Sequence, residues 1–337
     1  MKVLITGASG FLGSVLVRRV LAAGDQSVRV LVRRGSDTAA LDAAIGAAPQ
    51  ALIERHAGSL DTLAEALAAV QGVDLVYHLA AAKRGSAAEV LRGTLATSRN
   101  LLDAVREQPV PPRIVLVSSF GVHASAGLDD HALVDEATAL EPSPGRRDVY
   151  SHAKLEQERM FRDAHVRHGI GLVVMRPGVI YGEGHSAPSN RVGFGPRCGL
   201  FFLFGGDNPL PLTHVENCAE ALRFAATRAR FEGDTYDVVD EDPPGCRDYL
   251  RRYRAAHPGF VIVGVPFRIV RILAAWVAWL HRVTRGRVPA LLTPYRARAT
   301  WKPLRYSGAA LRALGFRQPI PSAQALARVF GEDRMRT

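Results

Sequence analysis

Three glycines, Gly7, Gly10 and Gly13, stand three residues apart near the start of the chain. An apolar run typical of a buried strand, residues 2–6, directly precedes them, and apolar residues at helical spacing follow as far as Gly24. A strand, a glycine turn and a helix in this order are typical of a dinucleotide-binding element. Glycines permit the tight turn and the close approach of backbone to pyrophosphate, and the helix N-terminus offers free N–H groups to the phosphates. We therefore expect a dinucleotide site at this turn.

Strand-like and helical patterns alternate through the first half of the chain, in the order 28–32 (strand), 60–70 (helix), 73–79 (strand), 87–106 (helix), 114–117 (strand), 149–166 (helix) and 172–175 (strand). A polar loop is expected between 33 and 59. The alternation predicts an α/β fold, a doubly wound parallel sheet of the Rossmann type, over 1–176. The pattern is less regular over 177–337, which we interpret as a smaller C-terminal substrate domain, with a strand and a helix near 213–240 rejoining the first domain.

Further motifs follow in order: Val76–Ala81 (VYHLAA), Ser118-Ser119 with Val122, Tyr150–Lys154 (YSHAK), Arg176–Gly182 (RPGVIYG) and Thr213–Asn217 (THVEN). With the glycine turn, they resemble the extended, epimerase-like branch of the short-chain dehydrogenase/reductase superfamily, with some features similar to 3β-hydroxysteroid dehydrogenases. The resemblance implies an NAD(P)-dependent enzyme. It also implies a set of cofactor-binding residues: Gly7, Ser9, Gly10, Phe11, Leu12, Gly13, Arg33, Leu79, Ala80, Ala81, Ser118, Tyr150, Lys154, Pro177 and Val179.

Three residues are the candidate catalytic group. Tyr150 and Lys154 are four residues apart in a predicted helix, so their side chains share one face. A nearby ammonium stabilises a phenolate, so we expect Lys154 to lower the pKa of Tyr150. By resemblance, Tyr150 transfers the proton, Lys154 tunes it and holds the nicotinamide ribose, and Ser119 orients the substrate oxygen.

The end of the second strand bears on the choice of cofactor. NAD-preferring members carry a carboxylate there for the ribose hydroxyls, whereas this chain has Val32 followed by Arg33 and Arg34. A guanidinium can bind a 2′-phosphate, which favours NADP(H) over NAD(H). The alternative is that these arginines form a solvated loop and that NAD is held by backbone contacts.

The residues after Ser119 restrict the reaction. Sugar-nucleotide dehydratases of the resembled family have an Asp-Glu pair at this place, whereas this chain has Phe120 and Gly121, so dehydration is disfavoured. The leading expectation is an oxidoreductase or epimerase that acts by hydride transfer at a carbinol or ketone carbon, with a nucleotide sugar favoured as substrate. The alternatives are a 3β-hydroxysteroid dehydrogenase-like enzyme acting on a hydrophobic or lipid-linked alcohol or ketone, and a non-catalytic NADP-sensing protein.

The positive charge is confined to one part of the chain. The net charge is +11, yet residues 249–331 contain no Asp or Glu. Within them, 267–282 predicts a helix that is apolar apart from basic residues and carries Trp276 and Trp279. Two interpretations stay open, peripheral contact with an anionic membrane through about 260–305, and burial of the apolar face in the substrate domain or a dimer interface, which we favour. Binding of an anionic substrate is a third use of the charge.

The remaining expectations concern compartment and partners. The cysteines, Cys198, Cys218 and Cys246, form no CxxC pair, so we expect neither a disulfide framework nor a metal site. The apolar N-terminal run is too short for a signal peptide, which favours the cytoplasm, with the inner face of the membrane as the site of any peripheral contact. We expect a small-molecule substrate and no nucleic acid, because no aromatic-basic motif is present. A homodimer is expected from the resemblance alone.

Overall fold

A seven-stranded parallel sheet forms the centre of the molecule, in a computed structural model that describes residues 1–24, 27–46, 52–81, 85–195, 199–285, 287–289 and 292–332. Its strands, in spatial order, are β12 (Glu232–Val238), β7 (Leu172–Pro177), β5 (Arg113–Val117), β4 (Leu75–His78), β1 (Lys2–Thr6), β2 (Ser27–Val32) and β3 (Ile53–Ala57). The inner strands are short and apolar because helices cover both of their faces. The strand order reverses between β1 and β4, and a crevice at such a switch point is where doubly wound folds bind ligands.

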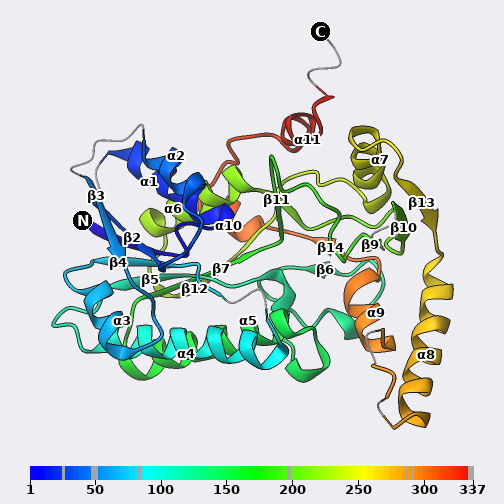
Figure 1. The fold of residues 1–337 in the computed structure, drawn as a ribbon, viewed down its shortest axis with the longest axis horizontal. Helices are drawn as coiled ribbons and strands as arrows, with labels where there is room; N and C mark the ends of the chain where they lie inside the picture. Colours follow the sequence, from blue (N-terminus) through cyan, green and yellow to red (C-terminus); the bar gives the residue numbers. More distant parts are fainter. Residues whose placement is uncertain are drawn as a thin grey trace.

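Two layers of helices enclose the sheet (Figure 1). One layer contains α1 (Phe11–Ala23), α2 (Ala39–Ile45) and α6 (Val215–Arg228), and the other contains α3 (Leu63–Val70), α4 (Ala87–Arg106) and α5 (Val149–His168). Each layer buries its own apolar cluster against the sheet. The predicted α/β doubly wound fold is confirmed.

The prediction of a polar loop from 33 to 59 is wrong, because this segment contains α2 and β3. The apolar pattern did not predict β3 because β3 is an edge strand whose side chains are only partly buried. Glu54, Arg55 and His56 interrupt any apolar run in this strand. Its backbone still pairs in parallel with β2. Pairing of one strand edge needs no apolar side chains, so the pattern of residues did not reveal it.

The second half of the chain adds small elements at one end of the sheet. The strands are β6 (Leu133–Val134), β8 (Val179–Tyr181), β9 (Gly193–Phe194), β10 (Leu200–Leu203), β11 (Leu212–His214), β13 (Val261–Gly264) and β14 (Arg305–Tyr306), in one three-stranded and two two-stranded sheets. The helices are α7 (Cys246–Ala256), α8 (Phe267–Val283), α9 (Pro294–Trp301), α10 (Ala309–Ala313) and α11 (Ser322–Phe330). Short 3-10 turns occur at Phe120–Val122, Ser125–Gly127 and Pro144–Arg146. A separate apolar cluster joins α7, α11 and β10.

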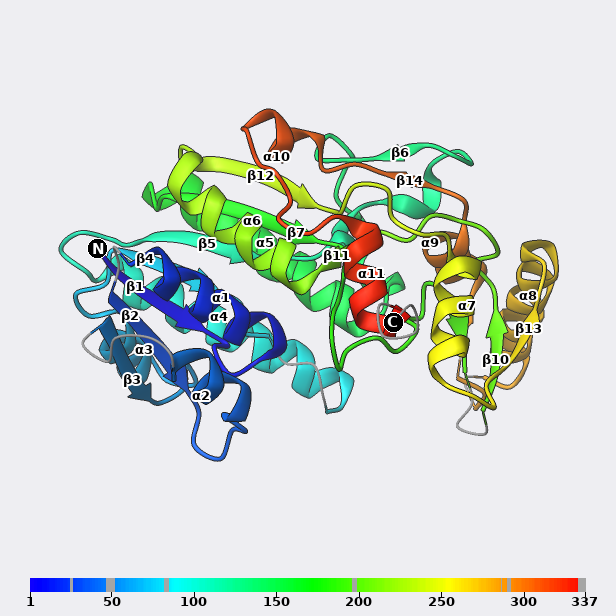
Figure 2. The same ribbon diagram turned by 90° about the horizontal axis from the view of Figure 1, so that it is seen from above.

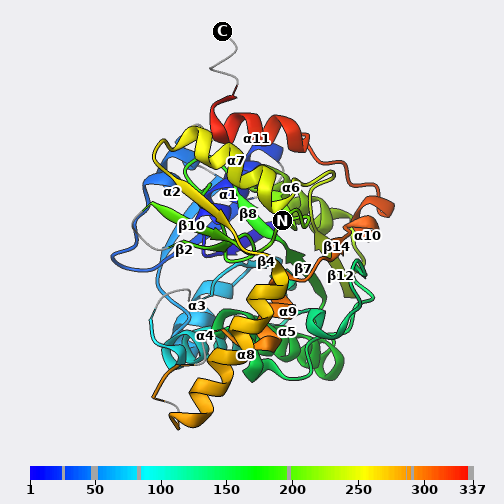
Figure 3. The same ribbon diagram turned by 90° about the vertical axis from the view of Figure 1, so that its right-hand side faces the viewer.

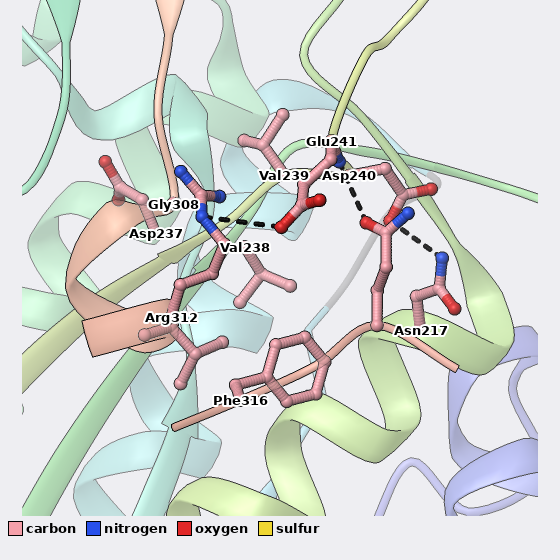
Figure 4. Close-up of a pocket in the computed structure, with 11 residues that line it drawn as sticks. Asn217, Asp237, Val238, Val239, Asp240, Glu241, Gly308, Arg312 and Phe316 are labelled. Carbon is pink, nitrogen blue, oxygen red and sulfur yellow. Dashed lines mark hydrogen bonds and ion pairs between the residues drawn. The ribbon is translucent and has the colours of Figure 1, made fainter. Parts of the chain in front are cut away.

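The later segments return to the first sheet. Strand β12 pairs with β7, and α6 packs against α1. The chain around α10 lies along β12, as Figure 2 shows from above. At this contact, Asn217, Asp240 and Phe316 line a cavity of about 10 Å³ (Figure 4), room for about one water molecule. Ser119, Tyr150 and Lys154 line neither this cavity nor a larger one of about 480 Å³ beside α11.

Helix α8 lies at the outer end of the molecule (Figures 1 and 3). Only Val270 and Ala274 of this helix are buried, in a small cluster shared with α9, while Ile272, Trp276 and Trp279 are 68%, 57% and 53% exposed. The expectation that its apolar face is buried in the substrate domain is therefore wrong, because no other described element of the chain covers that face. None of the described helices is long and apolar enough to cross a bilayer.

Candidate active site

The glycine turn joins β1 to α1 at the switch point of the sheet. Gly7 has a φ of +71°, and the Gly10 amide donates to the Gly7 carbonyl over 3.0 Å. A Cβ on Gly13 would lie 2.1 Å from the Gly7 oxygen, so only glycine allows the helix to start this close to the turn. Gly10 is the N-cap residue of α1 and has no side chain to bond the first backbone N–H groups of the helix. These N–H groups are therefore available to a ligand. The turn fits the pyrophosphate of a dinucleotide.

Strand β4 ends beside this turn. The hydroxyl of Thr6 accepts the backbone N–H groups of Leu79 and Ala80 over 3.2 Å each, which fixes the segment 79–81 next to Gly7. At the start of α1, the ring of Phe11 stacks on His185 at 3.9 Å. The predicted residues Ser9, Leu12 and Ala81 therefore lie around one turn.

Other predicted cofactor residues occupy different positions. Ser118 is buried, and its hydroxyl donates to Glu158 of α5 over 2.6 Å. Arg176 of β7 binds the same carboxylate. The Ser118 hydroxyl therefore helps to hold α5 against the sheet. Pro177 is the last residue of β7. Val179 is the first residue of β8, and its backbone N–H donates to the Pro211 carbonyl. Arg33 follows β2 and is exposed.

Helix α5 presents the catalytic candidates. Asp148 caps its N-terminus, accepting the Ser151 amide over 3.0 Å, and Tyr150 and Lys154 project one turn apart. Ser119 lies just beyond β5, and its hydroxyl hydrogen-bonds that of Tyr150. The structure thus brings Ser119, Tyr150 and Lys154 together at the carboxyl ends of β4 and β5.

The pKa of Tyr150 differs from the expectation. Burial raises it to about 12, the negative charge of Asp148 raises it further, and the Ser119 hydrogen bond opposes both. The expected net lowering of this pKa is wrong for this arrangement, because desolvation of the phenolate outweighs the Ser119 contact that opposes it. The phenol is therefore a proton donor at neutral pH.

The pH dependence of the two reaction directions should differ. Ketone reduction needs the protonated phenol and should be flat through the neutral range, whereas alcohol oxidation needs the phenolate and should rise with pH toward the pKa of Tyr150. Asp148→Asn removes a charge that raises this pKa while keeping a capping side chain, so the oxidation limb should move to lower pH. Initial rates in both directions across pH check this. If the pH dependence of the oxidation rate were the same in the variant and the unmodified protein, the role assigned to Asp148 would be contradicted.

A buried polar chain positions Lys154. Its ammonium donates to the Val117 carbonyl over 2.7 Å and to Gln157 Oε1 over 2.9 Å. With its oxygen turned to Lys154, the Gln157 amide donates to Ser98 over 2.8 Å and faces His78 Nε2 at 3.2 Å. His78 Nδ1 lies 2.9 Å from the hydroxyl of Thr6. Side chains therefore link the catalytic helix to the glycine turn.

His78 stays neutral inside this chain. Burial and then the charge of Lys154 lower its pKa to about 3. Accepting from Gln157 at Nε2 leaves Nδ1–H to donate to Thr6. Sequence reasoning placed His78 in a motif but missed Gln157, whose only signal is its position three residues after Lys154 on the same helix face.

Together these features define an NAD(P)-dependent oxidoreductase of the extended short-chain type, with a dinucleotide turn at β1 and a Ser-Tyr-Lys group at the same edge of the sheet. The chain belongs to the NAD dependent epimerase/dehydratase family, whose model matches residues 3–238.

Individual relatives differ in what they share with this chain. It is 31% identical over 299 residues to the 4-hydroxy-2-methyl-3-oxo-4-farnesyl-3,4-dihydroquinoline-1-oxide ketoreductase of Stigmatella aurantiaca, covering 86% of this chain and 84% of the relative. It is 33% identical over 192 residues to sterol demethylase protein B of Methylococcus capsulatus, covering 56% of this chain and 54% of that protein. The fold is similar to UDP-glucuronic acid 4-epimerase from Bacillus cereus, with a TM-score of 0.70 and 16% identity over 99% of both chains.

Proposed function

We propose that this chain reduces a carbonyl carbon of a hydrophobic, lipid-like substrate, and in the reverse direction oxidises the corresponding carbinol carbon. The observation that carries the proposal is the convergence of Ser119, Tyr150 and Lys154 beside the glycine turn. Tyr150 is a protonated donor there, as carbonyl reduction requires. The intact group argues against a non-catalytic NADP sensor.

Each catalytic side chain has a distinct task. Bound at the turn, the nicotinamide cofactor supplies or accepts the hydride. Ser119 and Tyr150 together hydrogen-bond the substrate oxygen, and Tyr150 transfers a proton to it as negative charge develops there. Lys154, held by Val117 and Gln157, keeps a positive charge at the base of the site, and its second task is to bind the nicotinamide ribose.

Similarity to known proteins favours a hydrophobic substrate. Phe120 and Gly121 follow Ser119, so the acidic pair of the sugar-nucleotide dehydratases is absent at these positions, which disfavours dehydration but not sugar epimerisation. Relatives matched by sequence are named for a farnesylated quinoline oxide and for sterol demethylation. The alternative of a hydrophobic or lipid-linked alcohol or ketone therefore moves ahead of the nucleotide sugar.

A nucleotide sugar is the second candidate because of two arginines near the loop after Ser119. The Arg147 side chain is buried and contacts the His123 carbonyl at 3.4 Å, and Arg191 contacts the Tyr306 hydroxyl at 3.4 Å. In the part of the chain that the structure describes, neither guanidinium forms an ion pair with a carboxylate. Such cations could bind an anionic substrate group.

A substrate panel distinguishes the candidates. The purified protein is mixed with NADPH or NADH and either prenylated, steroidal and long-chain alkyl ketones or nucleotide sugars, with cofactor oxidation and sugar epimerisation as readouts. Turnover of apolar ketones supports the proposal, and epimerisation with no ketone turnover contradicts it. Native mass spectrometry of the purified protein identifies any cofactor and ligand that remain bound.

The preference for NADP(H) is part of the proposal. Arg33 and Arg34 are exposed at the end of β2, and within the described residues neither guanidinium has an ion-pair or hydrogen-bond partner. Arg33→Ala should weaken NADPH binding about tenfold, roughly the value of one charge-assisted contact, and leave NADH binding unchanged. Titrations followed by nicotinamide fluorescence measure both constants. Tighter binding of NADH to the unmodified protein would overturn the preference.

Homodimerisation through a helix bundle and a cytoplasmic location complete the proposal. The dimer rests on family resemblance, and light scattering after gel filtration tests it. The location is supported by Cys218 and Cys246, which are free and buried, while Cys198 lies outside the described residues.

A further inference from the structure

Helix α8 carries two different surfaces that no other described element covers. One side of the helix, here called the apolar face of α8, carries Ile269, Ile272, Leu273, Trp276, Trp279 and Val283. At about 100° per residue these six positions fall within about a third of the helix circumference. Each is at least 43% exposed. The buried residues Val270 and Ala274 lie on the opposite side, against α9. The apolar face therefore points away from the protein.

Basic side chains border this face. Arg268, Arg271 and Arg282 share a strip between the apolar face and the buried side, here called the arginine strip. All three are exposed, and in the described part of the chain none forms an ion pair. By contrast, Arg252 on α7 binds Asp248 and Glu332, and Arg19 on α1 binds Glu216. The arginine strip thus lacks the carboxylates that neutralise Arg252 and Arg19.

The strand that precedes the helix also exposes apolar side chains. Val261 and Val263 on β13 are 53% and 40% exposed. They alternate along the strand and so share one side of it. Between 249 and 331 there is no acidic residue to repel an anionic surface.

We propose that α8 lies in the headgroup region of an anionic bilayer, with its apolar face in the lipid and the arginine strip on the phosphates. A long exposed face with two indoles and a flanking cationic strip is the pattern of an interfacial helix, and Trp side chains favour this depth. The uncompensated positive charge selects anionic over neutral lipid. A second copy of this chain would bring one arginine strip against another, so self-association explains the charge less well.

The same helix is connected to the active site. Helix α8 packs on α9, where the Ala299 carbonyl accepts a hydrogen bond from Ser125, which begins the second 3-10 turn after Ser119. Another α9 residue, Arg296, donates to the Arg147 carbonyl, three residues before Tyr150. A bilayer on the apolar face of α8 would thus be connected through α8 and α9 to the segments that flank the catalytic candidates, which suits the hydrophobic substrate proposed above. The docking itself does not depend on that substrate.

Vesicle binding tests the proposal directly. The full chain, without added substrate, is sedimented with vesicles of pure phosphatidylcholine or of phosphatidylcholine with phosphatidylglycerol. We expect binding to the anionic vesicles at low salt, a marked loss of binding at high salt, and a blue shift of tryptophan emission, because two of the three tryptophans lie on the apolar face. Brominated lipids should quench that emission.

Two pairs of variants separate the contributions. Arg268→Glu with Arg271→Glu should weaken anionic-vesicle binding at least tenfold, and Trp276→Ser with Trp279→Ser should also weaken the binding measured by sedimentation. Matched controls carry the same changes elsewhere: Arg228→Glu with Arg230→Glu, and Val110→Ser with Val166→Ser, at exposed positions. These controls should bind as the unmodified chain does.

Several outcomes would overturn the proposal. One is no binding to anionic vesicles at low salt, and another is equal loss of binding in the control variants. A third is a dimer in solution that the tryptophan variant dissociates while vesicle binding is absent, since this would assign α8 to a second copy. Ketone reduction measured on the same variants in detergent reports separately on the proposed function.

Discussion

Tyr150→Phe should reduce ketone reduction by about 10² to 10⁴-fold, the usual contribution of a positioned acid. Phenylalanine keeps the ring in its partly buried site on α5 but removes the hydroxyl that Ser119 contacts and that we propose transfers the proton. Cofactor binding should change little, because the glycine turn is untouched. The measurement is NAD(P)H oxidation with the best ketone of the panel, beside a cofactor titration.

A second tyrosine provides the control. Tyr236→Phe removes a hydroxyl on β12 and should retain full activity. If Tyr150→Phe were fully active, the catalytic assignment would fail and the NADP-sensing alternative would gain support. Loss of both activity and thermal stability would indicate a folding defect, which circular dichroism would reveal.

Gly13→Ala should weaken cofactor binding by about 10²-fold or more, equivalent to about 2.7 kcal/mol. The new Cβ would stand 2.1 Å from the Gly7 carbonyl oxygen and 2.9 Å from Ala8 Cα, so α1 must move away from the turn. This movement would displace the N–H groups that we propose bind the pyrophosphate. Overpacking of this kind also costs about 1–3 kcal/mol of stability.

A neighbouring glycine provides a graded comparison. A Cβ on Gly10 would meet the same oxygen at 3.2 Å, a contact that a small shift relieves, so Gly10→Ala should have the weaker effect. Nicotinamide fluorescence and thermal melting measure affinity and stability of both variants. Equal affinity of Gly13→Ala and the unmodified protein would contradict the proposed position of the pyrophosphate.

The parts of the fold that depend on local pattern were predictable. Buried parallel strands such as β5 consist of continuous apolar residues, and the glycine spacing permits few turns between a strand and a helix. The four-residue spacing of Tyr150 and Lys154 placed both on one face of α5. The edge strand β3 was not predicted, because strand pairing through the backbone does not require an apolar pattern in side chains that remain partly exposed.

The environment of the site was not predictable. A raised pKa for Tyr150 results from burial by elements distant in sequence, whereas the spacing to Lys154 suggested the opposite. The chain of hydrogen bonds from Lys154 through Gln157 and His78 to Thr6 joins residues up to 79 positions apart. Their contact depends on how α5 packs over β4.

The sequence by itself determined the class of fold, the glycine turn between β1 and α1, and the placement of Tyr150 and Lys154 on one face of a helix, because these depend on short-range spacing along one strand or helix. It also located all of the positive excess in residues 249–331. Only the tertiary structure decided that the apolar face of α8 is exposed, since the periodicity of an amphipathic helix is the same whether that face meets protein or solvent. What a helix packs against is a property of the whole chain, and here α9 contacts the opposite side.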